Sequence, residues 1–205
     1  MEQKKKSPKQ ILMTIGFVIV FLIAFWVAYG DQLMNFGYAP TLEIDGVTFR
    51  VGDKMEVLMD QGIKSKTNLE TGSMPAKSWN SMSINVNSGK ATSKDYSLAL
   101  YNETNSKQNL SECRIYMFRG IIAINQKEIV PVVLDGVSYL GKDAEEVKEA
   151  MKGAKLSSED DHSLWFYKGN YSFIFTLDDS YDKSRITVSK IEINRKINKD
   201  YKPAK

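Results

Sequence analysis

The sequence is poor in the side chains that most often carry out chemistry in proteins. Its 205 residues include one cysteine, Cys113, and one histidine, His162, and no His-rich zinc pattern. A single cysteine cannot form a disulfide within the chain. A Cys-His catalytic pair needs proximity and a third orienting group, and these two residues belong to different segments. We therefore expect a buried structural cysteine, a histidine in a solvated loop, and no enzyme.

The chain also lacks a charge imbalance beyond its first residues. The formal net charge is +3, and the first ten residues, with four lysines and one glutamate, account for all of it. By subtraction, the remaining residues hold 24 basic and 24 acidic side chains. A nucleic-acid-binding protein shows a basic field over its surface. The neutral remainder therefore argues against a nucleic-acid partner.

What the chain does have is a long apolar run near its front. No charged residue interrupts residues 11–29, and a group of lysines precedes them (Lys4, Lys5, Lys6 and Lys9). A helix of that length rises about 28 Å, close to the ~30 Å hydrocarbon core of a bilayer, and positive charge beside a span stays cytoplasmic. The pattern predicts a transmembrane signal anchor at 11–30 behind a cytoplasmic basic tail at 1–10. A cleaved secretory signal and a buried helix stay open as alternatives.

This interpretation fixes an expected location. It predicts a single-pass cell-membrane protein with a cytoplasmic N-terminus and an extracellular C-terminal domain. Secreted eukaryotic domains of this size often use several disulfides, so the lone cysteine favours a bacterial cell envelope. Abundant lysine, asparagine and isoleucine agrees with a Gram-positive bacterium. In that setting the glycosylation sequons are incidental (Asn102, Asn109 and Asn170).

After a linker at 31–40, one sequence pattern occurs twice. Residues 44–49 (Ile-Asp-Gly-Val-Thr-Phe) correspond to residues 134–139 (Leu-Asp-Gly-Val-Ser-Tyr), ninety positions later. Each copy leads into a helical pattern that begins at an aspartate suited to capping, Asp53 or Asp143. Segments of alternating hydrophobicity follow each helix.

This order predicts an α+β fold class. We expect the transmembrane helix to be followed by two tandem helix-plus-antiparallel-sheet repeats, at 41–130 and 131–198, and by a basic tail at 199–205. Lys168-Gly169-Asn170 fits a tight hairpin turn inside the second repeat.

Alternation also assigns a face to each residue of the expected strands. The aliphatic residues point toward the helices, and the opposite face receives six aromatic residues (Trp79, Tyr101, Tyr116, Phe118, Trp165 and Tyr167). Tyrosine and tryptophan are enriched at interface hot spots. The candidate partner-binding residues are therefore Trp79, Tyr101, Tyr116, Trp165 and Tyr167. Two alternatives are that aromatics simply favour strands, or that they fill the space between the repeats.

The repeated order of helix and strands, with Gly-Lys-Asp-Ala-Glu-Glu-Val at 141–147, resembles the β-lactamase-inhibitory-protein-like architecture. Small outer-membrane assembly lipoproteins share that architecture, as do lipoproteins of Gram-positive bacteria, which segments 96–104 and 110–116 resemble most. The resemblance covers 41–196 and implies a non-enzymatic binding protein with an aromatic-rich concave sheet. This chain departs from the lipoproteins because the predicted anchor replaces a lipid-modified cysteine. No inhibitory residue can be matched, so none is carried over.

The best metal candidate is the segment from Asp178 to Asp182, which has oxygen-bearing side chains at its first, third and fifth positions. A Ca²⁺-binding EF-hand loop also needs glycine at position six and glutamate at position twelve, where this chain has Lys183 and Ser189. The same residues suit a polar hairpin turn, and 157–162 suits a solvated loop. We therefore expect no metal and no cofactor.

Together the patterns predict a membrane-anchored, extracytoplasmic protein-binding module of the bacterial cell envelope, without catalysis. It would be an integral membrane protein with one span and an envelope protein as its partner. A membrane-coupled sensor or envelope assembly factor that acts through the anchor helix is the alternative. A wall hydrolase or transferase is a further rival.

Overall fold

The computed structural model describes residues 8–34, 37–65, 71–85, 96–121, 132–180, 183–197, 199–200 and 202–204. The chain divides into two compact units, Met1–Tyr38 and Ala39–Lys205. The first unit contains one long helix, α1 (Pro8–Met34). Its described side chains, at 13–27, are all exposed.

The predicted transmembrane anchor is wrong. Within the described residues, no helix is both long and apolar enough to cross a membrane. The same finding overturns three further predictions. These are the single-pass membrane integration, the signal anchor, and the cytoplasmic and extracellular placement of the two ends.

The predicted α+β class is also wrong, because the structure is mostly β, with fifteen strands and three α-helices among the described residues. The two helices expected after the front segment are short. Helix α2 (Glu56–Met59) has four residues and α3 (Ala144–Ala150) has seven. Strands, the longest of nine residues, are the main regular structure of the second unit.

The second unit contains a small four-stranded antiparallel sheet. Its strand order is β10-β9-β1-β2. The bounds are β1 Thr41–Ile44, β2 Val47–Arg50, β9 Val132–Leu134 and β10 Val137–Ser138. Both hairpins turn at an Asp-Gly pair with positive φ at both positions, 53° and 82° at Asp45-Gly46 and 49° and 80° at Asp135-Gly136. Two such residues form the type I′ turn that matches the right-handed twist of paired strands.

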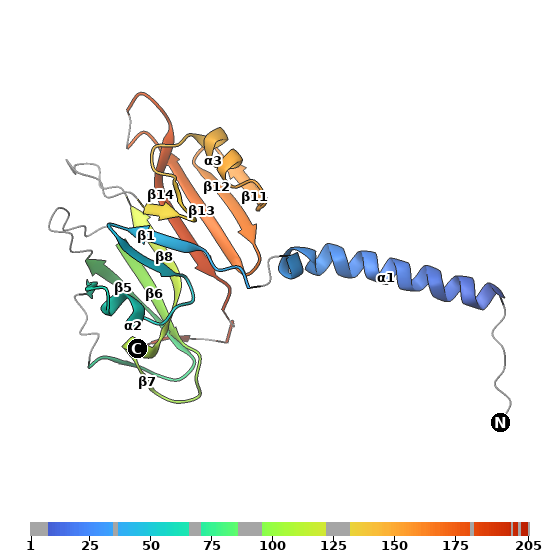
Figure 1. Ribbon diagram of the computed structural model, residues 1–205, viewed down its shortest axis with the longest axis horizontal. Coiled ribbons are helices and arrows are strands. Elements are labelled where there is room, and N and C mark those ends of the chain that lie inside the picture. Colours follow the sequence, from blue (N-terminus) through green and yellow to red (C-terminus); the bar gives the residue numbers. More distant parts are fainter. Residues whose placement is uncertain are drawn as a thin grey trace. The chain divides into compact units, whose positions relative to one another are not determined.

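A nine-stranded sheet forms the body of this unit (Figure 1). Its order is β11-β12-β13-β14-β8-β6-β5-β15, and β3 also pairs with β5. The bounds are β3 Lys64–Ser65, β5 Ser78–Asn85, β6 Tyr96–Asn102, β8 Arg114–Ile121, β11 Lys155–Asp160, β12 Ser163–Lys168, β13 Tyr171–Asp178, β14 Thr187–Arg195 and β15 Lys202–Pro203. All neighbours are antiparallel except β15, which runs parallel to β5. A two-stranded pair, β4 (Ser73–Met74) with β7 (Gln108–Asn109), and a short 3₁₀ turn, Leu110–Glu112, complete the unit.

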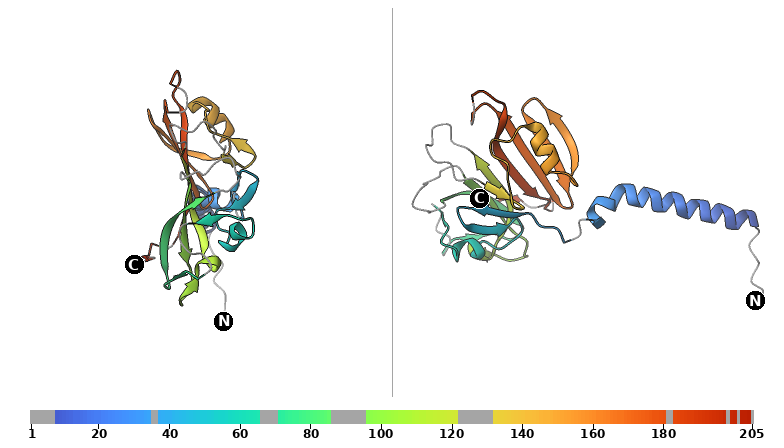
Figure 2. Two further views of the ribbon diagram at one scale, coloured as in Figure 1. Left: turned by 90° about the vertical axis from the view of Figure 1, so that its left-hand side faces the viewer. Right: turned by 45° about the horizontal axis from the view of Figure 1, so that its top comes forward.

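One face of the large sheet is covered and forms the core. Figure 2 shows α2 and α3 on the same side of the sheet, with the C-terminus on the other side. Phe49 of β2 meets Phe118 of β8 at 5.8 Å between ring centroids, and Tyr139 meets Phe175 of β13 at 4.8 Å. Each fully buried large apolar side chain contributes about 1.5–3 kcal/mol relative to exposure, so this layer holds the fold together.

A β-bulge in β8 changes which residues face the core. Leu98 of β6 pairs with Phe118 and Leu100 pairs with Ile115, so three residues of β6 oppose four of β8. The extra residue turns Phe118 inward, where it is fully buried. The prediction that Phe118 belongs to the outer aromatic face is therefore wrong.

Candidate interaction surface

The face of the large sheet opposite α2 and α3, called here the open face, carries two rows of directly paired residues. The first row, from β12 to β5, is Trp165, Ile174, Glu192, Arg119, Ser97 and Ser83. The second row is Tyr167, Ser172, Asn194, Met117, Ala99 and Ser81. Large side chains stand at the β12 end of both rows and small ones fill the β5 end.

Trp165 and Tyr167 form an exposed aromatic pair at the β12 end. They lie two residues apart on one strand, so both rings leave the same face of the sheet. Their exposed fractions are 39% and 42%. The Trp165 indole Nε1–H donates to Ser163 Oγ at 3.1 Å. Short polar or small neighbours, Ser158 of β11 beside Trp165 and Ser172 of β13 beside Tyr167, leave both rings open to solvent.

A small charged network occupies the middle of the open face. Arg119 reaches Glu192 Oε2 at 2.8 Å, and Lys190 lies 3.8 Å from the same oxygen. Asn194 donates to Glu192 Oε1 at 3.1 Å. The Glu192 carboxylate is thus held by donors from two strands, and this keeps the centre of the face polar.

The other three candidate aromatics pack on one another. Tyr116 meets Trp79 and Tyr101 edge to face, each at 6.0 Å between ring centroids, and Tyr101 is buried. Burial, together with the charge of Glu192, raises the pKa of Tyr116 to about 12. Trp79 and Tyr116 are half-buried, so these three rings form a packed group.

The structure therefore divides the five candidates into two groups. Trp165 and Tyr167 lie on β12, whereas Tyr116 lies on β8, three strand positions away in the sheet. At about 4.8 Å per strand this separation is about 14 Å. Only the β12 pair presents a large exposed aromatic area.

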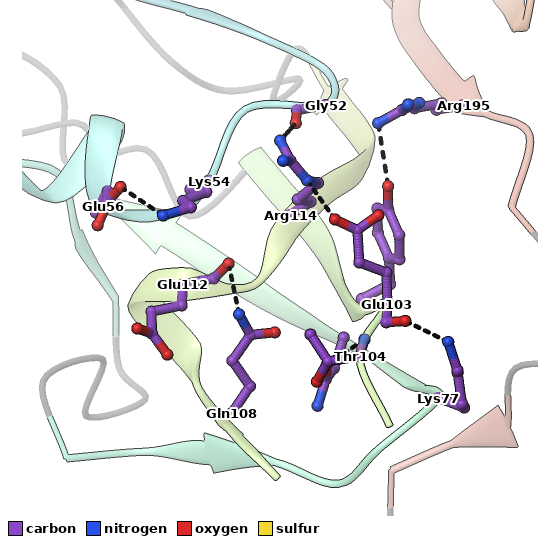
Figure 3. A network of polar contacts seen from close by, with 12 residues as sticks. Gly52, Lys54, Glu56, Lys77, Glu103, Thr104, Gln108, Glu112, Arg114 and Arg195 are labelled. Atoms are coloured by element: carbon purple, nitrogen blue, oxygen red, sulfur yellow. Dashed lines mark hydrogen bonds and ion pairs between the residues drawn. The ribbon is translucent and has the colours of Figure 1, made fainter. Parts of the chain in front are cut away.

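A polar network around Arg114 and Arg195 joins segments far apart in the chain (Figure 3). Arg195 Nη1 donates to the Tyr101 hydroxyl at 3.0 Å. Arg114 donates to the Gly52 carbonyl at 2.9 Å and to Glu103 at 2.8 Å. Gly52 has φ 117°, and a Cβ there would stand 3.1 Å from Arg195 Nη1, so glycine suits this position twice over. No local sequence pattern predicts the roles of Arg114 and Arg195, because their partners are main-chain or distant groups.

The two residues considered for catalysis do not meet. Cys113 is fully buried, its Sγ lies 3.3 Å from the Asn109 carbonyl oxygen, and burial raises its pKa to about 11, with a further contribution from Glu112. His162 is exposed in the turn between β11 and β12. Cys113 directly precedes β8, which lies three strand positions from β12 in the sheet. At neutral pH the thiol stays protonated, which is the unreactive form.

The carboxylates of both acidic segments accept hydrogen bonds from nearby groups. Asp178 accepts hydrogen bonds from the Ser180 N–H at 2.8 Å and the Ser189 hydroxyl at 2.6 Å. Asp182 lies outside the described residues. Asp160 accepts from the His162 N–H at 2.8 Å and the Ser163 hydroxyl at 2.9 Å. In the ranges that the structure covers, no group of three or more possible metal-ligating residues was found.

The segment expected as a solvated loop at 157–162 is partly a strand. Residues Lys155–Asp160 form β11, which pairs with β12 and is exposed at every position. Its sequence shows no alternation of apolar and polar residues, so the strand depends on its neighbour for stability.

Comparison with models of protein families, with curated proteins and with solved structures finds no match to this chain. The resemblance to the β-lactamase-inhibitory-protein-like architecture therefore stays a prediction, and no family is assigned.

Proposed function

We propose that this chain is a non-catalytic protein-binding module whose partner packs on Trp165 and Tyr167. The observation that carries the proposal is the exposure of these two rings, 39% and 42%, side by side on one strand of the open face. Exposed aromatic pairs of this kind cost solubility. Their exposure on a face that neither α2 nor α3 covers supports a binding role.

The chemistry of the two side chains suits an interface hot spot. Tryptophan and tyrosine bury a large area with few rotatable bonds and keep one polar group for a hydrogen bond. The open face next to them offers Ile174 as an apolar floor and the Arg119–Glu192 pair as a polar rim. An apolar centre with a polar edge is the usual anatomy of a protein–protein interface.

The absence of catalysis is part of the proposal. Cys113 is buried and its raised pKa, about 11, keeps it protonated, and His162 lies three strand positions away. An acyl-transfer mechanism that uses the thiol requires a thiolate beside a base. This supports a binding role over that class of enzyme.

A site-specific photocrosslinker tests the proposal. A benzoyl-phenylalanine at position 167 is expected to capture a protein partner from an extract of the source cells. The matched control is position 186, because Ile186 is also an exposed large apolar residue, at 54%, but lies in the 183–186 loop preceding β14. Capture at 167 and not at 186 supports the proposal. Equal capture at both positions, or capture at 186 alone, contradicts it.

A further inference from the structure

Strand β11 (Lys155–Asp160) forms one edge of the large sheet (Figure 1). Within the described residues its one sheet neighbour is β12, and all six of its residues are exposed. An uncovered edge strand presents unpaired N–H and C=O groups that can pair with another strand.

The edge of the small sheet is treated differently. Strand β2 is also an edge strand, but the Gln61 side chain accepts from the Thr48 N–H at 3.0 Å and donates to the Thr48 carbonyl at 2.8 Å. One amide therefore satisfies both main-chain groups of Thr48. No such cap on β11 is present in the ranges that the structure describes.

The pairing of β11 with β12 fixes the face of each β11 side chain. Lys155 pairs with Tyr167, Ser158 with Trp165 and Asp160 with Ser163, so these three point to the open face. Leu156 pairs with Phe166 and Glu159 with Leu164, so these two point to the covered face. A register shift at Ser157 separates the two halves of the strand.

Only one register pairs β11 with a second antiparallel copy of itself along its whole length. Directly opposite residues of an antiparallel pair must share a face. When Lys155 of one copy stands opposite Asp160 of the other, Leu156 stands opposite Glu159, and both pairs satisfy this rule. A shift by one residue would set Lys155 opposite Glu159, which faces the other side.

In that register the charges are complementary. A two-fold axis relates the two antiparallel copies of β11. It places Lys155 of one copy opposite Asp160 of the other at both ends of the paired strands. Hydrogen bonds from His162 and Ser163 lower the pKa of Asp160, so its carboxylate is charged at neutral pH. Ser157 and Ser158 meet at the centre, where small side chains allow the backbones to approach.

We propose that two copies of this chain associate through their β11 edges, with Lys155 of each copy opposite Asp160 of the other. The large sheet then continues across the dimer, and both Trp165/Tyr167 pairs lie on one continuous face. The paired segment has six residues, so we expect a small interface and weak association. This inference does not rest on the proposed partner-binding function.

Sedimentation of the full chain over a concentration series, with charge-exchange variants, tests the pairing. K155E places two acidic residues opposite each other at both ends, so the dissociation constant should rise about tenfold or more. The double variant K155E/D160K restores opposite charges and should return the constant toward the original value. K107E, a change of the same kind at an exposed lysine outside β11, should have no effect.

Cross-linking gives a readout that leaves Asp160 and its turn unchanged. Ser158→Cys should be joined between copies by a short bis-maleimide. Thr48→Cys, on the edge capped by Gln61, should not be joined, and the native Cys113 is buried and does not compete. The proposal would be overturned if the protein stays monomeric at 100 micromolar and Ser158→Cys forms no cross-links between copies. It would also be overturned if K155E leaves the dissociation constant unchanged.

Discussion

Thr41 and Asp135 exchange two hydrogen bonds across a sequence separation of 94 residues. The Asp135 N–H donates to the Thr41 carbonyl at 2.8 Å, and the Thr41 N–H donates to Asp135 Oδ1 at 2.8 Å. The two residues extend the β1–β9 ladder, in which Leu42 pairs with Leu134. The Asp135 side chain thus adds one hydrogen bond to the β1–β9 ladder that joins the two hairpins into a single sheet. That sheet supplies Phe49 to the core behind the open face.

Asp135→Ala should therefore destabilise the protein more than Asp45→Ala. Both aspartates occupy the same turn position with positive φ, so both variants suffer the same backbone strain. Asp135→Ala also loses the hydrogen bond from the Thr41 N–H. The corresponding donor to Asp45 would be residue 131, ninety positions after Thr41, and Pro131 has no N–H. We expect a difference of about 1 kcal/mol in the free energy of unfolding, measured by urea denaturation. Equal losses would show that the exchange of bonds contributes nothing.

The bulge in β8 makes Phe118 a core residue and Tyr116 a surface one. Phe118→Ala should cost about 3–5 kcal/mol of unfolding free energy, because it leaves a large cavity against Phe49 and Tyr96. Tyr116→Ala should cost less than half of that, since its ring is partly exposed. An unbulged strand would place both rings on the same face and make the two losses similar, so thermal unfolding of both variants distinguishes the arrangements.

Asn102→Asp should be strongly destabilising at neutral pH. The Asn102 amide is fully buried and lies within hydrogen-bonding distance of three carbonyl oxygens, of Met74, Pro75 and Ser106. An ionised carboxylate there would face three acceptors, at a cost of about 3 kcal/mol or more.

The same substitution carries a pH signature. Burial among acceptors raises the pKa of the new carboxyl above its unfolded value, so the penalty grows as pH rises above about 4. Unfolding of Asn102→Asp at pH 4 and pH 7 should show a smaller loss at pH 4. Asn109→Asp, at an exposed sequon, should change little at either pH. A loss of stability in Asn102→Asp that is the same at pH 4 and pH 7 would contradict this account.

Asp143 should make the protein sensitive to acid. It caps α3 by accepting from the Glu146 N–H at 3.0 Å, and this bond, with help from Arg185, lowers the pKa of the Asp143 carboxyl below 3.8. A carboxyl whose pKa is lower in the folded state stabilises above its unfolded pKa and loses that contribution as pH falls through the folded value.

Asp143→Asn keeps a capping side chain but cannot ionise. The wild type should therefore be the more stable of the two at pH 7, and the difference should disappear as pH falls below about 3.8. Chemical denaturation across that range measures it. A difference that persists unchanged in acid would assign the effect to something other than the charge.

Local sequence patterns predicted several strands of the second unit. Alternation marked the cores of β13 and β14, and Gly169, with φ 58°, lies in the two-residue turn between β12 and β13. The bulge in β8 could not be predicted, because alternation along one strand carries no record of its pairing register. That single missed residue turned Phe118 from the surface to the core.

Other features depend on distant partners. Strand β11 has no apolar period and exists because β12 pairs with it, so its segment was predicted as a loop. The apolar run at 11–29 predicted a membrane span that the described part of α1 does not support. The sequence pattern placed Trp165 and Tyr167 among the five candidate partner-binding residues. It could not separate them from the aromatics that pack together, because ring contacts between strands are not local.

The central claim is that Trp165 and Tyr167 bind a protein partner. The most direct test is the affinity of the partner captured at position 167 for Trp165→Ala/Tyr167→Ala. Ile186→Ala is the control, because Ile186 is also an exposed large apolar residue, at 54%. We predict that the double variant binds at least about tenfold more weakly, with its unfolding midpoint nearly unchanged, and that Ile186→Ala binds normally. Full affinity of a folded double variant would contradict the account.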